Sequence, residues 1–494
     1  MGATGVIGVM GTTGVIALNL PMLLIRKSLI ANDITKKYFW RDFFTRNKKN
    51  CIFASVFYIM IVAMLLRLTI QNMLSFYEKT TFDMFPNPKR ENFMNHINTK
   101  NKIHLLKHAL IYGANGSGKS NFVKVLIFLK SFVTIDNFLS NIDLNDFFFQ
   151  LVRSNKNPIK IEIEFFTKGN YYIYELEIQH SQANTIKEIL LLSGLGEQDD
   201  TIIFERIGNV VKPTIDNTIS TDLLKKNIGT SIIYLNNKYP VINNEHIQIV
   251  YDWFINYFDI ITINTQIPFL IDLMSRNKNL LDFANKLLSC LHITDSLKVG
   301  ETPIEKWMSS KKNSSELQQL LLKNPVNEHT GLTAFSNNRN NFNITVKNGE
   351  QIVQEFLFEQ LGIGGYKKKM NIASQSDGTV RLLTLIPALY NASEGKVVVI
   401  DEIENSMHPT LIYQLLKYFF NTDSKGQLIC TTHLTLLQDQ QDLVRPDELW
   451  KVEKQYGNSV MSSFNDYKIH NTMNIRKGYE EGRYGGVPQI RSIE

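Results

Sequence analysis

The stretch GANGSGKS occupies residues 113–120, directly after the apolar run LLKHALIY, and its last two residues begin the segment KSNFVKVLIFLKSFV. That segment has the apolar spacing of a helix, whereas the preceding run is typical of a buried strand. Gly113, Gly116 and Gly118 carry no Cβ atom, so the backbone between strand and helix can turn its N–H groups toward an anion. The pattern therefore predicts a phosphate-binding loop in an α/β fold.

Two residues of this loop predict nucleotide chemistry. Lys119 places a charge between the β- and γ-phosphates, and the hydroxyl of Ser120 can bind Mg²⁺. An ordinary glycine-rich turn is the alternative, but it requires neither the lysine nor the serine. We therefore expect ATP and Mg²⁺ as ligands. GTP is disfavoured because NNKY, which begins at residue 236, lacks the aspartate of a guanine-reading N-K-x-D motif. The nucleotide site is predicted to include Gly113, Asn115, Gly116, Ser117, Gly118, Lys119, Ser120 and Asn121.

A second buried strand, VVVIDE at 397–402, ends in two acids. Asp401 at a strand end can hold Mg²⁺, and Glu402 beside it can orient and deprotonate an attacking water. A solvated acidic loop is the alternative. It is disfavoured because the four apolar residues bury the strand and bring its end beside the phosphate loop, as in parallel α/β sheets.

A third strand, ICTTH at 429–433, ends in His433. This side chain can donate a hydrogen bond to the γ-phosphate. A lone histidine after an apolar strand is more often structural. Its position after the acidic strand favours a role in the site.

The stretch SQSDGTVRLL, 374–383, opens another apolar helix. Ser376 and the N–H groups of Gly378 and Thr379 predict a second anion-binding helix terminus. A helix merely capped by Ser376 or Asp377 is the alternative, and capping does not distinguish the two. We expect this terminus to lie too far along the chain to close on its own phosphate loop.

The order of these motifs resembles that of ABC-type ATPases in the AAA-15 and AAA-21-like group, which includes SMC-like, RecF-like and OLD-like proteins and the phage-defence AbiL and PARIS ATPases. The resemblance covers about 64–494. It rests on MLLRLTIQNMLSF, IYGANGSGKSNF, SQSDGTVRLL, VVVIDEIENSMHP, ICTTH and GYEEGRYGGVP. It implies an α/β fold: an ABC-type P-loop ATPase head with a β-rich lobe, a parallel-sheet lobe and a helical insertion.

The resemblance also implies roles for the residues. Ser376 and Gly378 would clamp the γ-phosphate held by a neighbouring copy, in a homodimer or higher homo-oligomer. Glu402 and His433 would be catalytic, Ser120 and Asp401 would bind the metal, and 404–409 would contact the partner. This chain has Gln375 where the family often has an acid before the serine. Gln150 is a candidate for the glutamine that bridges lobe and metal, and the adenine-contacting aromatic is unassigned.

Four segments are predicted along the chain. Residues 1–63 form an apolar and basic extension, 64–190 the first half of the ATPase head, 191–350 a mainly helical insertion, and 351–494 the second half. In the third segment, an apolar stripe is expected to lie in the core; it comprises Val250, Trp253, Phe254, Tyr257 and Phe258.

Charge and composition narrow the location and partners. The net charge is +6, and residues 1–63 account for all of it, with eight Lys or Arg against two Asp. The remaining body is neutral, so nucleic acid is a partner that the charge does not indicate. Three separate cysteines fit a reducing cytoplasm. Membrane association through 1–66 is the less favoured alternative to an extension upstream of the natural start, because the apolar run at 51–66 is shorter than the roughly 20 residues of a span.

These features predict a nucleotide-dependent dimeric ATPase that serves as a sensor or regulator in bacterial anti-phage defence. A separate effector, a nuclease or toxin, would supply toxicity, and a phage protein would be the trigger. The main alternative is a DNA-repair or genome-maintenance ATPase that clamps DNA. A transporter motor is favoured only by the apolar front end.

Overall fold

The computed structural model describes residues 7–9, 62–98, 103–153, 155–180, 186–212, 223–227, 229–239, 244–265, 270–309, 332–336, 339–467, 469 and 473–486. The chain divides into two units, 18–61 and the remainder, and every described residue belongs to the second unit. Most of 1–63 therefore lies outside the described residues, and so do the predictions that concern this extension. No helix among the described residues has the length and apolar character that a membrane span requires.

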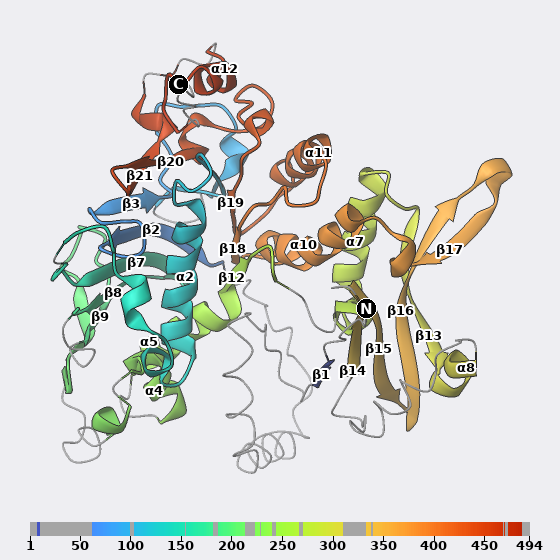
Figure 1. The fold of residues 1–494 in the computed structure, drawn as a ribbon, viewed down its shortest axis with the longest axis horizontal. Helices are drawn as coiled ribbons and strands as arrows, with labels where there is room; N and C mark the ends of the chain where they lie inside the picture. The colour runs from blue at the N-terminus through green and yellow to red at the C-terminus, as the bar shows by residue number, and fades with distance from the viewer. Residues whose placement is uncertain are drawn as a thin grey trace, which may run out of the picture. The chain divides into compact units, whose positions relative to one another are not determined.

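A largely parallel sheet carries the predicted motif strands, VVVI and ICT included (Figure 1). Its first five strands are parallel, and the last pairs antiparallel with the fifth. Their apolar runs are buried, as expected for strands covered on both faces. In order, the strands are β12 (Phe258–Ile261), β18 (Val397–Ile400), β19 (Gln427–Thr431), β6 (His108–Tyr112), β20 (Leu449–Gln455) and β21 (Asn458–Ser463).

The strands of this sheet divide their side chains between two hydrophobic cores. In β6, Ala109 and Ile111 belong to the first core, whereas Leu110 and Tyr112 belong to the second. The same alternation holds in β18 and β19, because successive residues of a strand point to opposite faces. The sheet is therefore the shared wall between two cores.

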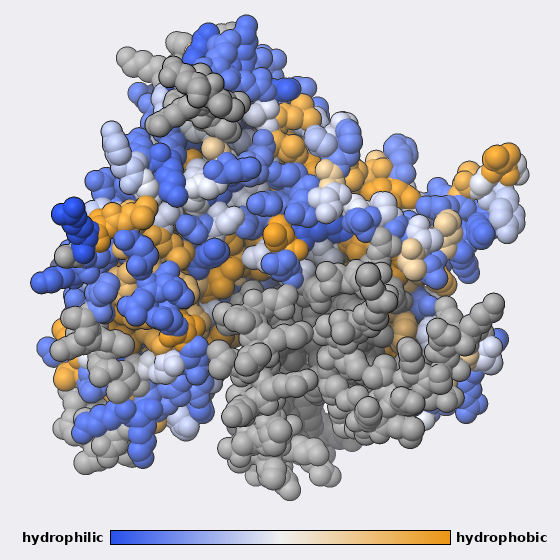
Figure 2. Space-filling view, viewed as in Figure 1, coloured by the Kyte–Doolittle hydropathy of each residue, from blue (hydrophilic) through white to orange (hydrophobic). Residues whose placement is uncertain are grey.

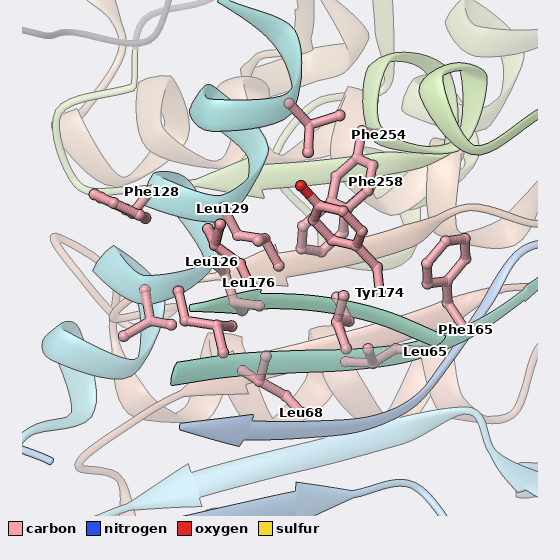
Figure 3. Close-up of a cluster of buried hydrophobic side chains, with 14 of the residues drawn as sticks. Leu65, Leu68, Leu126, Phe128, Leu129, Phe165, Tyr174, Leu176, Phe254 and Phe258 are labelled. Carbon is pink, nitrogen blue, oxygen red and sulfur yellow. The ribbon is translucent and has the colours of Figure 1, made fainter. Parts of the chain in front are cut away.

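The first core lies between the parallel sheet and an antiparallel sheet. Helix α2 (Lys119–Thr134) packs Leu126 and Leu129 against Leu65, Leu68 and other strand residues of this core (Figure 3). Strands β7 (Ile159–Thr167) and β8 (Asn170–Ile178) of the antiparallel sheet form a hairpin. The antiparallel sheet has the order β11 (Val210–Lys212), β10 (Thr201–Ile207), β9 (Ile186–Leu192), β8 (Asn170–Ile178), β7 (Ile159–Thr167), β2 (Met64–Gln71) and β3 (Thr80–Asp83).

The second core is covered by helices from the carboxyl-terminal part of the chain. Helices α10 (Asp377–Ser393) and α11 (Pro409–Phe420) both contribute leucines to it, and α12 (Ile475–Glu480) adds Tyr479. The SQSDGTVRLL stretch thus opens a helix, as predicted.

A third, antiparallel sheet follows the order β1 (Ile7–Val9), β14 (Leu332–Ser336), β15 (Arg339–Lys347), β16 (Glu350–Leu361) and β13 (Ser296–Pro303), with β17 (Lys367–Asn371) paired to β16. Helices α6 (Leu270–Arg276), α7 (Lys278–Cys290) and α8 (Ile304–Ser309) pack beside it. A two-stranded sheet joins β4 (Ile97–Asn98) to β5 (Leu105–Leu106).

The segment 191–350, predicted to be mainly helical, is mixed in its described part. It holds α4 (Ile232–Lys238), α5 (Glu245–Asp252) and α6–α8, but also strands of all three large sheets. The apolar stripe has its expected place in the core, because Val250, Trp253, Phe254 and Phe258 are buried and Tyr257 packs against them. The stripe is not one helix, however: Trp253–Tyr257 is a π-helical turn, and Phe258 starts β12. The four domain boundaries stay predictions.

Candidate functional site

The predicted phosphate loop joins β6 to α2. Lys119, the first residue of α2, is 5% exposed. Its Nζ atom donates to the carbonyl oxygens of Gly113 at 2.7 Å and Ala114 at 3.3 Å. The loop thus wraps around its own lysine, which holds the ammonium group inside the turn.

Gly118 is one position at which the loop requires a glycine. Its φ of +122° is one that L side chains rarely adopt, and a Cβ atom there would overlap Ser459. Gly118 precedes the first turn of α2, where no side chain caps the free N–H groups. The hydroxyl of Ser117 is also buried without a partner among the described residues. These unsatisfied donors are what an anion-binding helix start needs.

Two serines far away in sequence hold the loop in place. The hydroxyl of Ser459, on β21, donates to the carbonyl of Ser117 at 2.5 Å, and its oxygen lies 2.8 Å from Ser75 Oγ, within hydrogen-bond distance. Asn121 Nδ2 donates to the same Ser75 oxygen at 2.9 Å. Sequence reasoning missed both serines, because isolated serines carry no periodic or spacing signal.

Asp401 follows β18 and is fixed by the neighbouring strand. The Thr431 hydroxyl donates to Asp401 Oδ1 at 2.6 Å and accepts from the backbone N–H of Glu402 at 2.8 Å. Glu402 has a φ of +48°, which is uncommon for a residue with a side chain and costs free energy. The turn after Asp401 is therefore a strained one, held by Thr431.

Glu404 and His433 connect the acidic strand to the lysine. The backbone N–H of His433 donates to Glu404 Oε1 at 2.6 Å, and its Nδ1 lies 3.4 Å from Lys119 Nζ. Glu404 Oε2 is buried without a hydrogen-bond partner among the described residues. Glu404 was predicted only as part of the partner-contacting segment 404–409, and not as a member of the nucleotide site. Its acidity next to a strand end was the available signal.

Burial and neighbouring charges together set the pKa values of Lys119 and His433. Burial lowers the pKa of Lys119, and Glu404, Glu402 and Asp401 partly restore it. Burial also lowers the pKa of His433, and the nearby Lys119 lowers it further. The imidazole is thus neutral at neutral pH. Because an ammonium group only donates, Nδ1 of His433 is its acceptor, and the ring proton is on Nε2. His433 can therefore donate through Nε2.

The second predicted anion site lies at the start of α10. Ser376 is exposed and is the N-cap of α10; its Oγ accepts from the N–H of Thr379 at 3.2 Å. A Cβ atom on Gly378 would lie 2.9 Å from the carbonyl oxygen of Ser406. The segment 404–409 therefore touches the start of α10 in the same chain. The backbone of Ser406 comes so close to residue 378 that only a glycine fits there.

The structure brings together part of the predicted set. The phosphate loop, Asp401, Glu402 and His433 meet at the carboxyl ends of three adjacent parallel strands, where α/β sheets bind ligands. Among the described residues, the hydrogen bonds of the Ser376 side chain go to Thr379 and not to the phosphate loop. Gln150 donates to the carbonyls of Asn145 and Phe148, and Asn115 is exposed.

The predicted metal site consists of two oxygen donors, Ser120 and Asp401. No group of three or more His, Cys, Asp or Glu that could hold a metal ion occurs among the described residues. This donor set fits Mg²⁺, which is usually bound by one or two carboxylates together with substrate phosphates and waters.

Comparison with known proteins extends these observations. The model of the family described as "AAA domain, putative AbiEii toxin, Type IV TA system" matches residues 109–439, which are 331 of the 494 residues. No curated protein matches the chain. Among solved structures, the SMC head domain from Thermotoga maritima is 12% identical, with a TM-score of 0.38; the match covers 81% of this chain and 98% of that one. An Smc head domain from Pyrococcus furiosus, solved with an extended coiled coil and the C-terminal domain of ScpA, is 13% identical, also with a TM-score of 0.38; that match covers 85% of this chain and all of the other.

The family match includes the phosphate loop, the start of α10, the acidic strand and His433. It agrees with the resemblance that the motifs carry. The α/β class is also confirmed, by the parallel sheet and its helices. The chain belongs to this AAA-domain family.

Proposed function

We propose that this protein binds and hydrolyses ATP and acts as a nucleotide-dependent dimeric switch. The observation that supports this most directly is the cluster of Lys119, Asp401, Glu404 and His433 at the ends of adjacent strands, while Ser376 stays exposed at the start of α10. The cluster provides half of a nucleotide site, and the exposed helix start provides the other half to a second copy.

Binding is performed by the phosphate loop. The free N–H groups at the start of α2 and the buried Ser117 hydroxyl are donors that phosphate oxygens satisfy. Lys119 exchanges its bonds to two neutral carbonyls for stronger bonds to anionic phosphate oxygens. Mg²⁺, when bound through Ser120 and Asp401, neutralises phosphate charge. Thr431 keeps the Asp401 carboxylate in one orientation for that purpose.

Hydrolysis requires a base and a donor. Glu402 follows the metal-binding acid and accepts the proton of the attacking water. His433, neutral and protonated on Nε2, donates to the γ-phosphate oxygen on which charge develops. Glu404 holds the backbone of His433 and offsets the positive charge of Lys119.

Dimerisation would couple two such sites. In each copy, the start of α10 touches the segment 404–409, which follows the catalytic acids. When Ser376 and Gly378 of one copy engage the nucleotide of the other, the contact between Gly378 and Ser406 passes that engagement to the first copy's own acidic strand.

The biological role we propose is that of a sensor or regulator in bacterial anti-phage defence, with a phage product as trigger and a separate nuclease or toxin as effector. Its support is the motif resemblance and the toxin–antitoxin wording of the family description. Expressing the chain alone and with its neighbouring genes, then challenging with phage, tests this role. Full protection by the chain alone would contradict a separate effector.

A genome-maintenance ATPase of the RecF or SMC type is the second candidate. One observation favours it: a lysine-bearing hairpin directly precedes the α10 motif. Increased DNA damage sensitivity on deletion, without any change in phage resistance, would support this role over defence.

Mixing two inactive variants tests the composite site. Lys119→Ala removes the phosphate-loop charge, and Ser376→Arg blocks the start of α10. A mixed dimer holds one intact pair of half-sites, so an equimolar mixture should recover about a quarter of wild-type ATP turnover. A matched mixture of Lys119→Ala with Glu402→Gln recovers nothing at that site, because both changes affect the same half. Failure of the first mixture to recover any turnover would contradict the shared site.

A further inference from the structure

The most unusual surface of the molecule is the hairpin 357–371, formed by the end of β16 and all of β17 (Figure 1). We call it the lysine hairpin. Strand β16 pairs with β13 only as far as Glu359, which lies opposite Ser296. Strand β17 pairs only with β16, from Lys367 opposite Leu361 to Asn371 opposite Leu357. Beyond Glu359 the hairpin is therefore a free two-stranded ribbon.

The tip of the ribbon is ordered by its own hydrogen bonds yet exposes apolar side chains. The N–H of Gly362 donates to the carbonyl of Tyr366 at 2.6 Å, and that of Gly365 donates to Gly362 at 3.3 Å. Ile363 is fully exposed, Tyr366 is 67% exposed and Leu361 is 60% exposed. Figure 2 shows hydrophobic colour at the end of this projection and hydrophilic colour along it. An exposed apolar tip of this kind marks an interaction site.

Three exposed lysines, Lys367, Lys368 and Lys369, follow the tip in succession. Because side chains alternate along a strand, Lys367 and Lys369 lie on one face of the ribbon and Lys368 on the other. The acid among them, Glu359, is bonded to Lys298 at 3.2 Å and lies 3.5 Å from Lys367. Lys368 and Lys369 form no ion pair with any described residue. The ribbon is thus positive on both faces.

Edge protection explains only part of this arrangement. Lysine on an edge strand discourages pairing with another chain. That role needs no exposed isoleucine and tyrosine at the tip, and it needs charge along the open edge rather than on both faces. A protein partner would dock against one face. A membrane is the other ligand to consider, because an apolar tip beside basic residues supplies the two signals that anchoring takes, and binding to vesicles distinguishes it from DNA.

We infer that the lysine hairpin binds duplex DNA by entering the major groove. A two-stranded ribbon fits that groove, whose walls are phosphate backbones on both sides. Lys368 on one face and Lys369 on the other contact the two backbones, and Ile363 and Tyr366 meet the base edges, including thymine methyl groups. The deep, narrow major groove of duplex RNA does not admit such a ribbon.

The place of the hairpin in the chain gives this contact a consequence. Asn371 ends β17, a single 3-10 turn covers Ile372–Ser374, and Ser376 then caps α10. A duplex on the hairpin therefore acts on the helix start that we assign to the partner's nucleotide. DNA binding by the hairpin gives the second candidate function a specific contact surface, and it does not depend on the proposed ATPase switch.

Fluorescence anisotropy with a labelled DNA duplex of about 20 base pairs tests the inference, using the nucleotide-free full chain so that a failed ATPase assignment does not affect the result. Lys368→Glu/Lys369→Glu should weaken binding at least tenfold and reduce the slope of log K against log salt by about 2. Ile363→Ser/Tyr366→Ser should weaken binding while leaving that slope unchanged. Lys278→Glu/Lys286→Glu makes the same change of charge on α7 and should bind like the wild type.

Three outcomes would overturn the inference. Wild-type affinity in both hairpin variants would show that DNA does not use the hairpin. An equal loss in the α7 control would show a general charge effect. Hairpin-dependent binding to phosphatidylserine vesicles, without binding to the duplex, would assign the surface to a membrane instead. Circular dichroism confirms that each variant is folded.

Discussion

Nζ of Lys119 lies 3.4 Å from Nδ1 of His433, although 314 positions separate the two residues. The lysine thereby fixes the tautomer of the histidine, which leaves Nε2 to donate. His433→Ala should lower kcat for ATP hydrolysis about 100-fold, because one donor to developing negative charge is lost. His433→Gln, which keeps an N–H donor, should retain more activity. Steady-state turnover and nucleotide titration separate the two effects, since Kd for ATP should stay within a few fold. An unchanged kcat in His433→Ala would remove the histidine from the mechanism.

Two glutamates compete for the role of base, and conservative amides distinguish them. Glu402→Gln should lower kcat by about 1,000-fold or more and trap ATP-bound dimers, detected by light scattering after size exclusion. Glu404→Gln keeps an oxygen that accepts from the N–H of His433 and loses only the charge beside Lys119. It should cost less than tenfold in kcat. The reverse order of effects would make Glu404 the base.

Ser459 positions the phosphate loop from another strand. Ser459→Ala loses the hydrogen bonds to Ser117 and Ser75, which contribute about 1 kcal/mol each at most. The expected results are a several-fold rise in KM for ATP and a lower melting temperature. Ser462→Ala, on the same strand β21, is the matched control. Equal behaviour of the two variants would mean that Ser459 does not support the loop.

The buried His108 makes stability depend on pH. Its ring stacks on Phe420 at 4.0 Å, and burial, with smaller effects from His96 and Lys107, lowers its pKa well below the usual 6.5. Below about pH 6.5 the unfolded chain binds a proton that the folded chain does not, so the free energy of unfolding falls as the pH falls. His108→Phe removes this contribution. When the pH is lowered from 7.5 to 5.5, the free energy of unfolding of His108→Phe, measured with urea, should fall by about 1.4 kcal/mol less than that of the wild type.

The control for this experiment is His104→Gln, which changes an exposed histidine on the same segment. It should follow the wild-type pH dependence. If His108→Phe loses as much stability toward low pH as the wild type, another group governs the acid transition, and the His96–Glu448 pair, joined at 2.9 Å, is the next to change.

The sequence predicted the features that are local along the chain. Glycine spacing, continuous apolar strands and helix starts depend on neighbouring residues, so the phosphate loop, the acidic strand and the α10 start could be located. The hydrogen bond from Ser459 to Ser117 joins residues 342 positions apart, so it could not be predicted from the sequence. Short strands such as β12 were hidden inside a helical pattern because four residues carry little periodicity. The lysine hairpin escaped notice because charge was averaged over a neutral body.

The alternation of β6 side chains between two cores has a mechanical implication. Moving β6, the strand that ends in the phosphate loop, would disrupt the packing of both cores. We therefore expect β6 to stay in place when nucleotide binds. Helix α10 and the β16 residues Phe356 and Phe358 are embedded in the second core alone. Movement that nucleotide binding causes should therefore pass through α10 and this part of β16. The tip of the lysine hairpin should then be displaced the furthest.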